Sequence, residues 1–181
     1  MITTIPDCPI TGTSAKIIKQ CVMSSSSALY KSSKGYHTGV DIECSGTVYS
    51  LTYGSVIQCD REPAGYTVTI QYDATRCFQY KYLNFTAVKL NDQVDSGTKI
   101  GEVNNQVHFE YLSPTKSLWP VRIGARTYYK NDPMDILING FAESASDYRN
   151  KLQSISTVWD LSQPTEFPSG YAMEELSNNR G

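Results

Sequence analysis

The sequence contains few charged residues and no run of basic ones. Asp, Glu, Lys and Arg make up 19% of its 181 residues, and the formal net charge is −2. Proteins that bind nucleic acid usually present a dense basic patch, so we expect no nucleic-acid partner. No apolar run approaches the roughly 20 residues that cross a bilayer, so we expect no membrane-spanning helix.

The N-terminal residues also lack the features of a secretory leader. Met1 to Gln20 contain neither a basic start nor an apolar core, so we expect no signal peptide and synthesis in the cytoplasm. The cysteines show no CxxC spacing, and their odd number favours reduced thiols or a partial disulfide set. The five are Cys8, Cys21, Cys44, Cys59 and Cys77.

Histidine occurs only twice, as His37 and His108. Asp41 follows His37 by four residues, and Glu110 follows His108 by two. Two His and one Asp, with an open fourth position, are a ligand set expected of a catalytic zinc ion. The alternative is that each histidine is an ordinary surface or core residue, which is the commoner case for an isolated histidine.

The spacing of His37 and Asp41 requires a bend if both bind one metal. Helical positions i and i+4 share a face, but Thr38 and Gly39 are poor helix formers. On a straight strand the two side chains would lie about 13 Å apart, whereas zinc–ligand bonds are about 2 Å long. We therefore predict a bend at Thr38–Gly39, which glycine permits, and then a strand over residues 40–44.

Residues 36–110 have the pattern of a β-sheet protein. Short segments rich in β-branched and aromatic residues, such as 46–50, 55–58 and 66–72, are separated by Gly, Pro and Asp turns. In the segment 106–110, Gln106, His108 and Glu110 are predicted to share one face of a strand. The pattern predicts a mainly β fold, an antiparallel sandwich or barrel-like sheet.

Several segments follow one another in an order known from one protein family. They are His37-Thr38-Gly39-Val40-Asp41-Ile42, Gly46–Tyr49, Tyr66–Ile70, Tyr80-Lys81-Tyr82-Leu83, Asn91–Gly101, Gln106-Val107-His108-Phe109-Glu110 and Asp132–Leu137. In this order they resemble the lysostaphin-like zinc peptidases, which cleave peptide cross-bridges in bacterial peptidoglycan. The resemblance covers residues 36 to 138 and implies the lysostaphin-type fold.

The same resemblance implies one Zn²⁺ bound by His37, Asp41 and His108, with water as the fourth ligand. The family also uses two non-ligand histidines beside the metal. This chain has Tyr82 and Gln106 at those positions, so both histidines are replaced.

The replacements change the chemistry that the site can perform. Tyr82 and Gln106 can each donate a hydrogen bond to a developing oxyanion. Neither is a good base near neutral pH, since an unperturbed tyrosine has a pKa near 10. Loss of acid–base assistance typically costs about 10²–10⁴-fold in rate. Glu110 is a candidate substitute base or ligand-orienting residue, and the alternative is a structural carboxylate.

Two functions are therefore open. In the first, the chain is a zinc-binding, catalytically impaired module that contacts the wall or serves a structural role. In the second, it is an active zinc endopeptidase that cleaves peptidoglycan cross-bridges with Tyr82 and Gln106 in place of the histidines. Peptidoglycan is the expected partner of both. We favour the first because both non-ligand histidines are replaced.

The ends of the chain are predicted to flank the peptidase-like domain. Residues 1–35 form a loop-rich segment, 36–138 the domain, and 139–181 a C-terminal helix and extended tail. Apolar residues at helical spacing predict the helix from about Ala142 to Ser156. Helix and tail are candidate contacts to other subunits of an assembly. With no signal peptide expected, one route to the wall is incorporation into a phage particle or tail-like machine.

Overall fold

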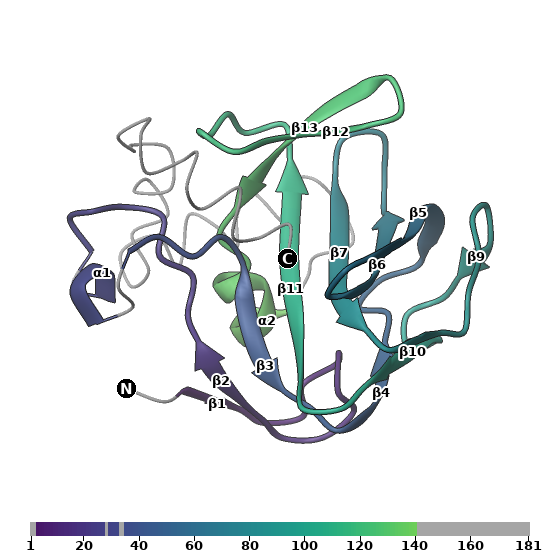
Figure 1. Cartoon of the computed structure of the whole chain (residues 1–181), viewed down its shortest axis with the longest axis horizontal. Coiled ribbons are helices and arrows are strands. Elements are labelled where there is room, and N and C mark those ends of the chain that lie inside the picture. Colours follow the sequence, from purple (N-terminus) through teal and green to yellow (C-terminus); the bar gives the residue numbers. More distant parts are fainter. Residues whose placement is uncertain (1–2, 28, 33–34, 141–181) are drawn as a thin grey trace.

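The computed structural model describes residues 3–27, 29–32 and 35–140 of the chain. Antiparallel strands form a large sheet, and one of its central strands also pairs with a β-ribbon (Figure 1). In order along the sheet the strands are β1 (Thr3–Ile5), β2 (Ala15–Lys19), β3 (Val40–Glu43), β11 (Gln106–Ser113), β7 (Cys77–Leu83), β6 (Gly65–Gln71), β5 (Gly54–Glu62) and β9 (Gln93–Val94). The ribbon of β12 (Pro120–Ile123) and β13 (Arg126–Asn131) joins this sheet through β11.

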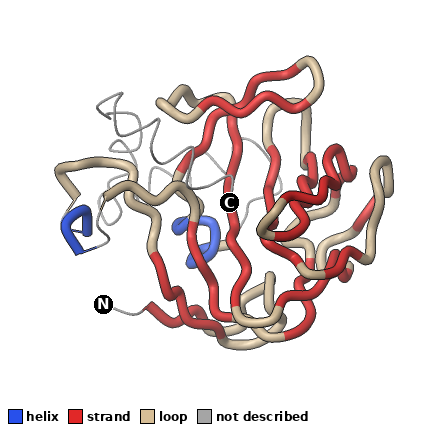
Figure 2. Tube along the Cα trace, in the orientation of Figure 1, coloured by secondary structure: helices blue, strands red, loops and turns tan. Residues whose placement is uncertain are grey.

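A second, smaller sheet completes the β structure. It consists of β4 (Gly46–Tyr49), β10 (Lys99–Val103) and β8 (Phe85–Thr86). The helices of the described residues are short, α1 (Leu29–Ser32) and α2 (Met134–Asn139), so strands and loops dominate Figure 2. None of these helices has the length and apolarity required to span a membrane. The prediction of a mainly β, antiparallel fold is confirmed.

The core forms because the central strands alternate apolar and polar residues. On β11, Phe109 and Tyr111 point into the core, where Phe78 of β7 stacks on both rings at centroid distances of 5.7 and 5.3 Å. Apolar residues of the smaller sheet, such as Val48 and Ile100, belong to the same buried cluster. The opposite face of β11 is therefore left for the polar residues His108 and Glu110.

The N-terminal segment contributes to the large sheet. Residues 15–19 form β2, which pairs with β3, and β1 extends the sheet beyond β2. Much of the rest of this segment is loop, apart from α1. All five cysteines are free thiols. The helix predicted over Ala142–Ser156 and the tail lie outside the described residues; within them, the C-terminal helix is α2.

Candidate metal centre

His37 is held just before β3 by backbone and side-chain hydrogen bonds. Its backbone N–H donates to the carbonyl of Val22 (2.9 Å), and the Val22 N–H donates back to the carbonyl of His37 (2.8 Å). Its side chain is buried, with Nδ1 3.0 Å from the carbonyl oxygen of Gln20. A carbonyl oxygen can only accept, so Nδ1 carries the proton and Nε2 keeps its lone pair for a metal.

The bend between His37 and Asp41 is present and depends on Gly39. Gly39 has a φ of +89°, a conformation that favours glycine, and β3 begins at the next residue. A Cβ atom at this position would lie 2.6 Å from the carbonyl oxygen of Phe109. The predicted bend is therefore confirmed. Close packing against β11 is a second reason why glycine is required at this position.

The bend brings His37, Asp41 and His108 together. His108 lies opposite Asp41 in the β3–β11 pairing, and its Nδ1–H donates to Oδ1 of Asp41 at 2.7 Å. Oδ2 of Asp41 lies 3.4 Å from Nε2 of His37. One potential ligand atom from each of the three residues lies within 4.8 Å of the others.

These distances fit a zinc ion. Four tetrahedral ligands with bonds of about 2.0 Å lie roughly 3.3 Å from one another. The observed separations of 2.7 and 3.4 Å bracket that value, so small side-chain adjustments suffice to make room for an ion. The donor set of two imidazoles and a carboxylate also suits zinc.

The electrostatics of the triad keep Asp41 ionised. Burial alone would raise the pKa of Asp41, but hydrogen bonds and charge interactions with His108 and His37 outweigh it and lower the pKa. Burial alone would likewise lower the pKa of His108. Its contacts with Asp41 and Glu110 outweigh that effect and raise the pKa. A carboxylate that is ionised at neutral pH is ready to act as a ligand.

Glu110 lies behind the triad in a buried network of charges. Its Oε1 is 3.6 Å from Nε2 of His108, 3.0 Å from Nζ of Lys130, and accepts a hydrogen bond from the Thr38 hydroxyl (2.9 Å). Nζ of Lys81 lies 3.6 Å from Oε2. Burial would raise the pKa of Glu110, yet the charges of Lys130 and Lys81 lower it well below its usual range. Held in this way, Glu110 is a poor candidate for a proton acceptor.

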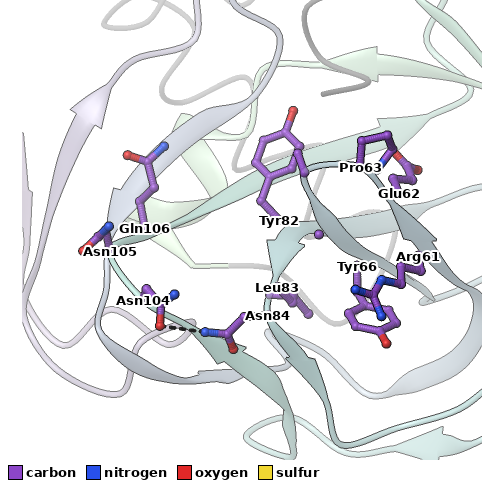
Figure 3. A pocket seen from close by; sticks show the side chains of 12 residues that line it. Arg61, Glu62, Pro63, Tyr66, Tyr82, Leu83, Asn84, Asn104, Asn105 and Gln106 are labelled. Atoms are coloured by element: carbon purple, nitrogen blue, oxygen red, sulfur yellow. Dashed lines mark hydrogen bonds between the residues drawn. The ribbon is translucent and has the colours of Figure 1, made fainter.

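Tyr82 and Gln106 line a cavity beside the triad. The cavity has a volume of about 430 Å³, with Tyr82 and the β5–β6 turn on one side and Asn104–Gln106 on the other (Figure 3). The ring centroid of Tyr82 lies 5.6 Å from that of His108. Tyr82 has a φ of +69° beside an irregularity in the β6–β7 pairing. The structure thus brings Tyr82 and Gln106 to the edge of the predicted metal site.

Two lysines near the site were not predicted. The alternation of β7 places Lys81 opposite His108, so pairing the two strands would have found it. Lys130 lies on β13, outside the segments around His37 and His108, and only the pairing of β13 with β11 brings it near. No local sequence signal marks it.

Comparison with known proteins supports the fold and the class of the domain. Residues 35–118, just under half of the chain, match peptidase family M23. A search of curated proteins finds no match to this chain.

Solved structures show the same fold at low sequence identity. Lysostaphin has a TM-score of 0.50 and 21% identity, over 70% of this chain and 53% of that one. A zinc-containing peptidase from Vibrio cholerae has a TM-score of 0.50 and 22% identity, over 61% and 37%. A chain of the SpoIIQ–SpoIIIAH pore-forming complex has a TM-score of 0.55 and 16% identity, over 81% and 94%. The matched region is thus similar in sequence to peptidase family M23, and the chain shares the fold of lysostaphin.

Proposed function

We propose that this chain is a zinc-binding, peptidoglycan-directed domain in which hydrolysis is slow or lost. Nε2 of His37, a carboxylate oxygen of Asp41 and Nδ1 of His108, once this nitrogen has released its proton, would hold the ion. Zinc supplies Lewis-acid activation of water and of a peptide carbonyl. The family match and the convergence of the three donor atoms support this assignment.

The proposal that hydrolysis is slow or lost rests on the small number of histidines. The chain has only two histidines, and both belong to the triad, so none remains to transfer protons beside the metal. Glu110, the nearest further carboxylate to His108, is engaged by two lysines and a threonine. We propose that it orients the imidazole of His108 through Nε2, as carboxylates behind zinc-bound histidines commonly do. Tyr82 and Gln106 then bind the substrate carbonyl.

A rescue experiment tests this proposal. The double variant Tyr82→His and Gln106→His restores two bases at the edge of the cavity, and we expect cleavage of purified peptidoglycan to rise by about 10²–10⁴-fold. Metal content is measured on the same sample, with about one zinc per chain expected in both proteins. Tyr66→His, on β6 in the same cavity, is the matched control and should give no gain. Absence of zinc from the unmodified protein would contradict the proposal.

An active endopeptidase is the second candidate, favoured by the position of Tyr82 beside His108. In that case the unmodified protein cleaves peptidoglycan in a zinc-dependent manner, and the Tyr82 hydroxyl stabilises the oxyanion. Tyr82→Phe should then lower the rate by about 10²-fold without changing zinc content. If the Tyr82→Phe variant cleaves peptidoglycan as fast as the unmodified protein, the tyrosine does not have this role.

Incorporation into a phage or tail-like particle remains a prediction from the sequence. It requires that the protein be present stoichiometrically in purified particles. Quantitative mass spectrometry of such particles tests it directly.

A further inference from the structure

A second cavity lies next to the first one. It has a volume of about 690 Å³ and is bounded by the N-terminal segment, the end of β3, β4 and the turn between β10 and β11. Asn104 and Asn105 of that turn line both cavities, so the two cavities adjoin at this turn. Since residues 4–16 contribute one wall, this cavity includes a part of the chain outside the family match at 35–118.

The second cavity opens on the same face of the large sheet as the metal triad. Asp41 pairs with His108, and two residues further along Glu43 pairs with Gln106. Directly paired residues of antiparallel strands point to the same face, as do residues two apart on one strand. Glu43 therefore continues the face of Asp41 and lines the second cavity, while Gln106 lines the first.

Two opposite charges in the second cavity have no ionic partner among the described residues. Lys16 and Glu43 are both exposed and both line it, yet neither forms an ion pair with the other or with any other residue of the described ranges. Around them lie hydroxyl groups, such as those of Thr13 and Thr47, and the two asparagine side chains of the turn. This lining suits a ligand that carries a cation, an anion and several amides.

We infer that the second cavity is a subsite for a charged peptide arm of a branched substrate. Glu43 binds a free ammonium group of the arm and Lys16 binds a free carboxylate. The adjoining arm crosses Asn104–Asn105 and reaches the first cavity beside the triad. The inference rests on the proposed function, because a cross-linked wall peptide is branched and carries such end groups.

Binding of defined peptides tests the inference. The probe is a branched synthetic peptide with one free amine and one free carboxylate, compared with copies that are N-acetylated or C-amidated. Isothermal titration should show about tenfold weaker binding for Glu43→Gln with the free-amine peptide and no effect with the acetylated one. Lys16→Gln should show the same pattern for the free carboxylate and its amide. Both residues are exposed, so neither change should unfold the protein.

The controls separate this inference from the proposed function. Glu102→Gln and Lys99→Gln, which alter an exposed ion pair elsewhere, should leave binding unchanged. The titrations are repeated in Asp41→Asn, which is expected to lack zinc, and dependence on the charged ends should persist there. Unchanged affinity in the Glu43 and Lys16 variants would overturn the inference. Competition by a neutral N-acetylglucosamine oligomer, with no dependence on peptide ends, would overturn it in favour of a glycan.

Discussion

At the scale of single residues, Asp41 is the centre of the candidate metal site. Its two carboxylate oxygens contact the two histidines separately, 2.7 Å from His108 Nδ1 and 3.4 Å from His37 Nε2. Without a metal, these contacts compensate for the burial of the carboxylate. With a metal bound, the same atoms would be its ligands, and this one residue would link the stability of the site to its metal content.

Asp41→Asn should abolish zinc binding. An amide is a weaker ligand than a carboxylate, and it removes the negative charge that offsets the ion. Metal analysis after purification without chelators should fall from about one zinc per chain to near zero. Asp95→Asn, an exposed carboxylate away from the site, is the matched control and should retain zinc. Full zinc content in Asp41→Asn would remove Asp41 from the ligand set.

Glu110→Gln should weaken both zinc binding and stability. Loss of the carboxylate behind a zinc-bound histidine typically costs about 10–100-fold in metal affinity. It also leaves Lys81 and Lys130 buried without their counter-charge, for which about 3–5 kcal/mol is expected in urea unfolding. Glu102→Gln, in the exposed pair with Lys99, should cost less than about 1 kcal/mol. Equal effects of the two substitutions would refute the role of Glu110.

At the scale of elements, the turn into β3 and the start of α2 each depend on one residue. Gly39 allows the chain to bend into β3, and Phe109 and Glu110 of β11 leave no room for a Cβ atom at this position. Asp132, half-buried ahead of α2, accepts a hydrogen bond from the backbone N–H of Met134 at 2.9 Å. Gly39 thereby couples a local conformation to the packing of the large sheet, and Asp132 stabilises the start of α2.

Gly39→Ala should destabilise the fold and disturb the metal site. The substitution combines a strained positive φ with a contact of 2.6 Å to backbone, so we expect a loss above about 2 kcal/mol and lowered zinc affinity. Gly97→Ala has a similar φ of +86° but no atom within 4 Å of the added Cβ. It should show only the smaller conformational cost in thermal unfolding, with zinc affinity unchanged. A Gly39→Ala protein as stable as Gly97→Ala would mean that β11 can move aside.

Asp132 should make stability depend on pH in the acidic range. Burial raises the pKa of Asp132 to about 6, against 3.8 for the unperturbed group. The protonated carboxyl is thus favoured in the folded state. The contribution of this carboxyl to the free energy of unfolding is fully present below about pH 4 and is lost as the pH rises through 6. Relative to Asp132→Asn, the wild-type protein should lose about 1–3 kcal/mol of unfolding free energy between pH 4 and pH 7. Parallel pH profiles from chemical denaturation would contradict this.

At the scale of the whole molecule, the metal would tie together segments that are distant in the chain. His37 precedes β3, Asp41 lies within it and His108 lies on β11, while the carbonyl that fixes His37 comes from Gln20 at the end of β2. A ligand that binds only this folded arrangement shifts the unfolding equilibrium. Stability and metal loading are therefore linked across the large sheet.

Zinc should raise the thermal stability of the protein by mass action. At a free zinc concentration of 100 times the dissociation constant, the stabilisation is about 2.7 kcal/mol. Differential scanning calorimetry should show an increase in Tm with zinc and its reversal by a chelator. The Asp41→Asn protein is the control, and its Tm should not respond. An equal zinc response in that variant would place the ion elsewhere.

The β fold follows from sequence patterns, and the resemblance to a known family pointed to His37, Asp41 and His108. Alternation with period two defines strands locally, and a positive-φ bend needs a glycine, so residues 106–110 and Gly39 could be interpreted without tertiary information. The contact of Lys130 with Glu110, and the cavity that Glu43 and Lys16 share, could be found only in the folded structure. Those relations depend on which strands pair and in what register, and strand pairing is set by contacts between residues far apart in the chain.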